Sequence, residues 1–153
     1  MGIAKSAIGR RMPPITATIE RGRLMFFAEA IGETNPLYTD VTVARAAGHP
    51  DLPVPPTFLF GLLLEGPDAL GWMHEVGIDL RYLLHGNEAF TYHSMAHAGD
   101  TLTFSPVITD VFEKRGGALE FLSRESAVTR PDGTPVATLT EMIVVRHPEL
   151  ETT

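Results

Sequence analysis

The sequence predicts an α+β fold in which a curved antiparallel sheet of about five strands wraps around one central helix, with an overlay of helices from the amino-terminal half. Two observations predict this fold. Residues up to about Gly77 are rich in helix and loop signals, and the rest of the 153-residue chain is rich in strand signals. Between them lies a short segment that is apolar on every side, which is typical of a helix buried at the centre of a protein.

The central helix is predicted over residues 58–65, where the chain is at its most hydrophobic. Prolines at positions 53, 55 and 56 impose an extended approach to this segment, and Thr57 is placed to cap the helix. A membrane-spanning helix needs about 20 apolar residues, so this run is too short to be one.

The amino-terminal half begins with a predicted strand over residues 15–19, which are β-branched and alternate in polarity. A helix is expected over residues 21–31, because apolar residues repeat there at helical spacing, and Gly32 ends it. A second short helix is expected over residues 41–47, with Asp40 as its N-cap and Gly48 as its end.

Four strands are predicted in the carboxy-terminal half, over residues 83–96, 101–112, 118–129 and 135–146. Turn residues separate them at 99–100, 114–117 and 130–133. Long antiparallel strands that follow one apolar helix indicate a sheet wrapped around that helix. Such a sheet has an open edge, which favours pairing with a second copy or a related chain.

Composition restricts the classes of function. The chain has no cysteine, which excludes disulfides, thiolate metal sites and cysteine nucleophiles, and which fits a reducing cytoplasm. The formal net charge of −7 argues against a nucleic-acid partner, because phosphate binding needs a clustered basic surface. We expect one domain over residues 1–153, located in the cytoplasm, with no membrane or nucleic-acid partner and no cofactor.

One segment resembles a known family. Residues 27–38 read Phe-Ala-Glu-Ala-Ile-Gly-Glu-Thr-Asn-Pro-Leu-Tyr, which is similar to the Gly-Asp-x-Asn-Pro-x-His signature of the MaoC-like (R)-specific enoyl-thioester hydratases and dehydratases. The likeness continues through the proline-rich entry at 52–58, the His-Gly-Asn-Glu strand start at 85–88 and the turn at 98–100. It is closest to the N-terminal MaoC, or fatty-acid-synthase-like dehydratase, branch. It implies a hot-dog fold, often as one half of a double hot dog.

The resemblance implies a catalytic segment at Glu33, Asn35 and Tyr38. Active enzymes of the family carry Asp at the position of Glu33 and His at the position of Tyr38. Hydration of a double bond conjugated to a thioester needs a base for the water and an acid for the α-carbon. Tyrosine, with an ordinary pKa of about 10, is a poor substitute for histidine near neutral pH. Glu33 as base with Tyr38 as acid stays open if burial tunes both groups, and so does a loop kept only for folding.

The resemblance also implies a substrate-binding region at the start of the central helix. Free backbone amides there would stabilise negative charge on the thioester oxygen. The two prolines before the helix have no N–H, so the amides of the first helical residues are the expected donors. The expected substrate-binding residues are Thr57, Phe58, Leu59, Phe60 and His85.

Two other chemistries have less support in the sequence. Glu65 lies at the end of the central helix, where hot-dog thioesterases often place a catalytic carboxylate, but a solvated position is the simpler interpretation. His85, His93 and His97 share strand parity, yet no neighbouring carboxylate has ligand spacing. We therefore expect no metal site.

The expected function is the interconversion of (R)-3-hydroxyacyl and 2-enoyl thioesters of CoA or acyl-carrier protein. In the favoured version, this chain shapes the acyl tunnel of a heterodimer whose hot-dog partner holds an intact Asp/His pair. In the other, a homodimer works through Glu33 and Tyr38. A thioesterase using Glu65 and a non-catalytic acyl-thioester-binding module are the alternatives. Arg45 and Arg81 are candidates for contacting a CoA phosphate.

Overall fold

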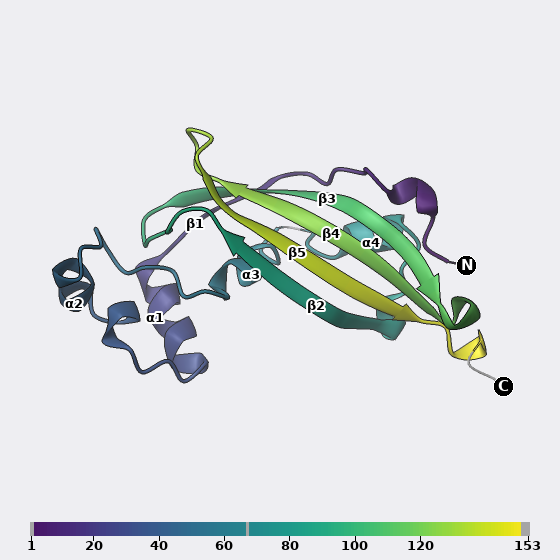
Figure 1. Cartoon of the computed structure of the whole chain (residues 1–153), viewed down its shortest axis with the longest axis horizontal. Coiled ribbons are helices and arrows are strands. Elements are labelled where there is room, and N and C mark those ends of the chain that lie inside the picture. Colours follow the sequence, from purple (N-terminus) through teal and green to yellow (C-terminus); the bar gives the residue numbers. More distant parts are fainter. Residues whose placement is uncertain (1, 67, 151–153) are drawn as a thin grey trace.

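The protein is organised around one antiparallel sheet. The structure is a computed structural model that describes residues 2–66 and 68–150. The strands are β1 (Ile15–Thr18), β2 (Leu83–Tyr92), β3 (Thr101–Lys114), β4 (Leu119–Thr129) and β5 (Pro135–Arg146). They are arranged in the order β1-β3-β4-β5-β2, and each neighbouring pair is antiparallel. The short β1 and the long β2 are therefore the two edges of the sheet. Figure 1 shows the long strands curving together.

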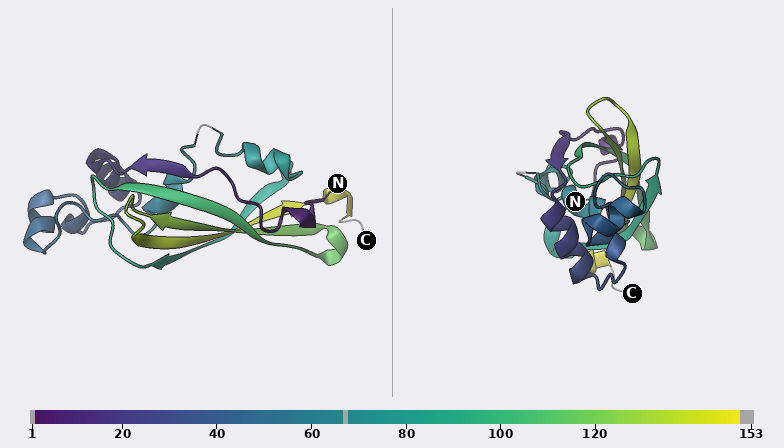
Figure 2. Two further views of the ribbon diagram at one scale, coloured as in Figure 1. Left: turned by 90° about the horizontal axis from the view of Figure 1, so that it is seen from above. Right: turned by 90° about the vertical axis from the view of Figure 1, so that its left-hand side faces the viewer.

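The helices occupy two places relative to this sheet. The central helix α3 (Phe58–Leu62) and the short α4 (Gly71–Glu75) lie on one side of the sheet, as the view from above in Figure 2 shows. In Figures 1 and 2, α1 (Arg21–Ala30) and α2 (Val41–Ala46) extend beyond one end of the strands. The 3-10 turns are Lys5–Ala7, Pro36–Tyr38, Leu80–Tyr82, Arg115–Gly117 and Pro148–Leu150. The predicted curved sheet around a central helix is confirmed.

The central helix is shorter than the predicted segment 58–65. Phe58, Leu59 and Leu62 are buried, as a helix at the centre of the molecule requires. After Leu62 the hydrogen bonds change to i→i+3, with the N–H of Leu63 donating to Phe60 O and that of Leu64 to Gly61 O. Such 3-10 tightening is common at helix ends.

The amino-terminal elements follow their local signals. The Asp40 carboxylate accepts hydrogen bonds from the N–H groups of Thr42 and Val43 and so caps α2. Gly32 and Gly48, which follow α1 and α2, have φ of 72° and 95°, a left-handed conformation that ends helices. Thr57, in contrast, occupies the N-cap position of α3 without a side-chain capping hydrogen bond.

Strand β2 ends earlier than predicted, at Tyr92 and not at Ala96. The N–H groups of His93 and Ser94 both donate to Val136 O, so regular pairing with β5 stops there. The chain then pairs with the segment before α3, where the N–H of Val54 donates to Ala96 O. This contact joins the end of β2 to the entrance of the central helix.

The core consists of two apolar clusters along the length of the strands. The first cluster surrounds α3 and includes Leu59, Leu62, Phe104 and Leu139. The second lies under α4 and includes Trp72, Ile108, Leu122 and Ile143. Between them, three charged side chains of neighbouring strands lie in register on the buried face: Glu88 of β2, Glu141 of β5 and Arg124 of β4. We refer to these three residues as the polar row.

Among the described residues, no helix has the length and apolar character needed to cross a membrane.

Candidate functional site

The loop between α1 and α2 holds the three residues predicted as catalytic, and its side chains are used locally. Glu33 Oε1 accepts a hydrogen bond of 2.8 Å from the N–H of Asn35. Asn35 Oδ1 in turn accepts one of 3.0 Å from the N–H of Leu37 and caps the 3-10 turn. Leu37 packs against the first apolar cluster. These bonds fix the loop and already engage the carboxylate of Glu33.

Tyr38 lies near the end of the edge strand β2. Partial burial, and then the neighbouring Tyr38, raise the pKa of Tyr92 to about 12. Tyr92 stacks on Phe90 of the same strand, with ring centroids 6.0 Å apart and an interplanar angle of 4°. The catalytic roles predicted for Glu33, Asn35 and Tyr38 therefore stay predictions, with Tyr38 placed at the sheet edge.

The start of the central helix offers fewer donors than predicted. The N–H of Phe58 donates to Pro55 O at 3.1 Å, so this amide is engaged. Leu59 and Phe60 belong to the first helical turn, whose amides have no acceptor within the helix. The ring of Phe58 is packed edge-on against Phe27 of α1, at 5.4 Å between centroids. This contact ties α1, and the loop that follows it, to the helix start.

Glu65, the candidate thioesterase carboxylate, is held by an arginine. Arg23 Nη1 of α1 donates to Glu65 Oε2 at 2.7 Å, and Arg23 Nη2 contacts Glu65 Oε1. A bidentate guanidinium occupies the carboxylate oxygens that would activate water. The solvated structural role expected for Glu65 fits this pairing.

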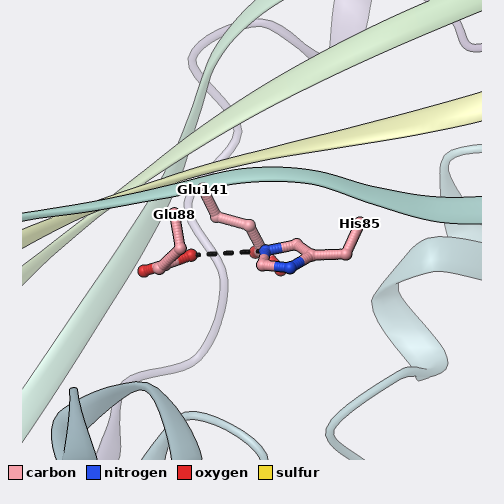
Figure 3. Close-up of side chains that lie close together, drawn as sticks. All are labelled: His85, Glu88 and Glu141. Atoms are coloured by element: carbon pink, nitrogen blue, oxygen red, sulfur yellow. Dashed lines mark ion pairs between the residues drawn. The ribbon is translucent and has the colours of Figure 1, made fainter.

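His85 lies between the central helix and the polar row. Its ring stacks on Phe60 of α3, with centroids 5.3 Å apart and an interplanar angle of 17°. Its Nε2 lies 3.6 Å from Glu88 Oε2, and Figure 3 shows His85, Glu88 and Glu141 gathered at one place. One ligand-type atom of each of these three residues lies within 4.8 Å of those of the other two.

A β-bulge explains why His85 and Glu88 face the same side. The register against β5 shifts between His85 and Asn87, so that His85 pairs with Ile143 and Glu88 with Glu141. In a regular strand, residues three apart point to opposite faces. The expectation that no neighbouring carboxylate has ligand spacing does not hold for His85, because the bulge brings Glu88 to its side of the strand.

The polar row is electrostatically unbalanced. Arg124 Nη2 lies 2.5 Å from Glu141 Oε2, and its guanidinium lies over the ring of Trp72, 4.8 Å from the centroid. The contact with Glu141 is an ion pair, and Glu141 Oε2 has no hydrogen-bond partner among the described residues. Glu88 has neither an arginine at this distance nor a hydrogen-bond partner on either carboxylate oxygen there. Desolvation first, and then the charge of Glu141, raise the pKa of Glu88 to about 7, against a smaller lowering by Arg124.

The other histidines have separate partners. His93 Nε2 lies 2.9 Å from Thr138 Oγ1, and His97 Nε2 lies 3.1 Å from His49 Nδ1. Burial is the main cause that lowers the pKa of His97. The three histidines that share strand parity in the sequence do not form one group.

Both arginine candidates for a phosphate contact have carboxylate neighbours. Arg81 Nη2 donates to Asp79 Oδ2 at 2.6 Å, and Arg45 Nη2 lies 3.7 Å from Asp51 Oδ2. Each guanidinium therefore has a nearby counter-charge.

A cavity of about 230 Å³ lies beside the polar row, between the amino-terminal segment and the chain that links α3 to α4. Its walls include Leu63, Trp72, Pro106 and the guanidinium-bearing Arg124. The cavity is smaller than the roughly 300–1,000 Å³ of drug-sized ligand sites, and it has room for a short apolar group.

The curled antiparallel sheet around a central helix defines a protein of the hot-dog class. A family model described as "FAS1-like, dehydratase domain region" matches residues 6–139. A relative from Saccharopolyspora erythraea, called a UPF0336 protein, is 35% identical over 147 residues, covering 95% of this chain and 93% of the relative. The chain therefore belongs to the FAS1-like dehydratase family.

Two solved structures share this fold. The HadBC (3R-hydroxyacyl-ACP dehydratase) complex of Mycobacterium tuberculosis contains a chain that is 22% identical, with a TM-score of 0.77 and coverage of 90% of this chain and 96% of that one. A MaoC-like dehydratase is 19% identical, with a TM-score of 0.83. The similarity covers 95% of this chain and 44% of that longer chain.

Proposed function

We propose that this chain is a subunit of an acyl-thioester hydratase or dehydratase that interconverts (R)-3-hydroxyacyl and 2-enoyl thioesters of CoA or acyl-carrier protein. It shapes the acyl-binding region, and a second hot-dog chain supplies an intact Asp/His pair. Membership of a dehydratase family supports the reaction class. Location in the cytoplasm stays a prediction.

The observation that carries the partner version is the state of Glu33. Its carboxylate accepts a hydrogen bond from the backbone of its own loop, and the position of the family's histidine holds Tyr38. Hydration requires that the oxygen of water bonds to the β-carbon while a proton is delivered to the α-carbon. Glu33, whose carboxylate is already bonded within its loop, and the phenol of Tyr38 are poorly suited to activating water and protonating the α-carbon near neutral pH.

Two further features support a subunit that holds substrate. The cavity beside Trp72 and Arg124 has mostly apolar walls, as the end of an acyl chain requires. Strand β2 is a ten-residue sheet edge, and an uncovered edge of that length is suited to pairing with another chain. The similar HadBC structure is itself a complex, and the longer MaoC-like dehydratase has room for a second domain of this size.

The test is hydration of crotonyl-CoA, followed by the loss of enoyl-thioester absorbance. We expect no activity from the purified chain alone. Activity should appear when it is mixed with a hot-dog chain that carries Asp-x-Asn-Pro-x-His, and it should persist with Glu33→Gln in this chain. Glu29→Gln, at an exposed position on α1, is the matched control.

Activity of the chain alone that disappears in Glu33→Gln but not in Glu29→Gln would contradict the partner version. The homodimer working through Glu33 and Tyr38 would then be the correct interpretation. Hydrolysis of acyl-CoA by the chain, lost in Glu65→Gln, would instead point to a thioesterase, against the pairing of Glu65 with Arg23.

A further inference from the structure

We propose that His85, Glu88 and Glu141 form a binding site for a divalent transition-metal ion, with Zn²⁺ as the representative ion. This inference goes beyond the proposed function and does not depend on it. It rests on the geometry of three potential ligands, on an unpartnered buried carboxylate, and on the charges of the polar row.

The geometry is close to that of a zinc site. The three ligand atoms lie within 4.8 Å of one another, and His85 Nε2 is 3.6 Å from Glu88 Oε2. With zinc–ligand distances of about 2.0–2.2 Å, two ligands of a tetrahedral ion lie about 3.4 Å apart. Side-chain rotations that move these ligand atoms by roughly an ångström would therefore bring all three to one ion. His85, whose side chain is 47% exposed, is able to make such an adjustment.

The surroundings of Glu88 independently favour a cation at this place. Its side chain is only 10% exposed, and both of its oxygens lack a hydrogen-bond partner within residues 2–66 and 68–150. Figure 3 shows its carboxylate directed toward the ring of His85. A buried polar group without a partner costs stability, and a buried charge without one costs more. A metal ion would satisfy this carboxylate directly.

The charges of the polar row favour a cation. Glu88 and Glu141 are direct cross-strand partners, a placement that destabilises a sheet when both are charged. Arg124 forms an ion pair with one of the two carboxylates and compensates its charge. A divalent ion would leave one positive charge on the cluster, which favours an exchangeable anionic fourth ligand.

The donor set selects the class of ion. One imidazole nitrogen and two carboxylate oxygens suit zinc and similar transition metals. Calcium needs about six to eight oxygen ligands, which this cluster does not offer. Three protein ligands with one open position are also the pattern of zinc sites that exchange their fourth ligand.

The experiment is calorimetric titration of the chelator-treated full chain with zinc chloride, with Co²⁺ absorption as a second measurement of coordination. We expect one ion per chain and a visible Co²⁺ spectrum of tetrahedral type. Glu88→Gln and His85→Gln should each weaken binding by at least about 100-fold, because loss of a direct ligand exceeds the 10–100-fold effect of an outer partner. Glu125→Gln and His93→Gln, at exposed positions on or beside the same sheet, are the matched controls.

Two results would overturn the site. One is a zinc dissociation constant above about 100 μM, because binding of that strength is too weak for specific coordination. The other is zinc binding of equal strength in wild type, Glu88→Gln and His85→Gln, which would assign the ion to another surface. Far-UV circular dichroism of each variant verifies its fold, and exposed His85 provides a substitution that leaves the core intact. None of these measurements uses the hydration reaction, so the site and the proposed function can fail separately.

Discussion

Glu33 and Glu88 are both incompletely buried carboxylates, and their immediate neighbours give them opposite properties. Glu33 accepts a backbone hydrogen bond from Asn35 in its own loop. Glu88 faces Glu141 and His85, and neither of its oxygens has a hydrogen bond from the residues that the structure describes. One oxygen of Glu33 is thus engaged by its own loop, whereas a proton or a cation would stabilise Glu88. The residue with unusual chemistry is therefore on the strand and not in the loop that carries the family signature.

The His49–His97 pair predicts an acid-sensitive part of the fold. Burial, the largest cause, lowers the pKa of His97 from its ordinary 6.5, with His49 and Arg130 acting in the same direction and Asp100 and Asp51 against it. As pH falls below about 6.5, the unfolded chain takes up a proton that folded His97 resists, so stability decreases. Stability from neutral His97 is fully present above pH 6.5 and is lost toward the lower folded pKa.

His97→Gln should flatten this acid limb, because glutamine does not titrate. The measurement is the urea midpoint between pH 7.5 and pH 5, compared with wild type and with His74→Gln, an exposed position on α4. An unchanged slope in His97→Gln would show that His97 does not set the acid limb.

At the scale of elements, the bulge in β2 determines what the edge strand presents to the core. Gly86 is the extra residue between His85 and Asn87. A Cβ at Gly86 would lie 3.0 Å from both Met142 O and Val144 Cγ2 of β5. The missing side chain permits the close approach of the two strands at the bulge.

Gly86→Ala should therefore destabilise the fold by about 1–3 kcal/mol through overpacking. Gly61→Ala is the matched control, because a Cβ there meets nothing within 4 Å. Within the exposed face of α3 that change should stabilise by about 0.5–1 kcal/mol. Urea unfolding of both variants is the measurement, and equal stability of Gly86→Ala and wild type would mean that the bulge adjusts without cost.

The sequence predicted elements well where local signals determine them. The strand predictions for β4 and β5 agree with the structure within one residue, and Asp40 caps α2 as its position indicated. The central helix was predicted too long, because hydrophobicity continues to Leu64 while the helical hydrogen bonds stop earlier.

The polar row was missed for a reason of register. Glu141 has the same strand parity as Leu139 and Ile143, so its burial was readable in the sequence. That Arg124 and Glu88 are its neighbours could not be predicted from the sequence, because these pairings depend on the alignment of three strands. The bulge then reverses the parity relation between His85 and Glu88, and only Gly86 hinted at it.

At the scale of the whole molecule, the sheet has two unequal edges. Strand β1 has four residues, and the side chains of Thr16 and Thr18 bond to threonines of β3. Strand β2 has ten residues, and Ala89 and Thr91 are exposed on it. The longer edge offers more backbone for pairing, carries His85 and Glu88, and ends near Tyr38.

We predict that oligomerisation uses β2. The double variant Ala89→Lys/Thr91→Lys places charges on that edge, which natural proteins use to prevent strand pairing. It should be monomeric by light scattering after size-exclusion chromatography, under conditions where wild type forms a dimer with itself or its partner. Thr16→Lys/Thr18→Lys on β1 is the matched control. Monomers from the β1 variant and dimers from the β2 variant would assign the interface to the opposite edge.

The separation of the core into two apolar clusters has a consequence for local unfolding of the protein. The long strands contribute to both clusters, and the polar row lies between them. We expect that local opening of the cluster under α4 exposes Trp72 and its neighbours while the cluster around α3 stays closed. Amide protons of strand β5 should therefore exchange with solvent at two different rates, one for each side of Glu141.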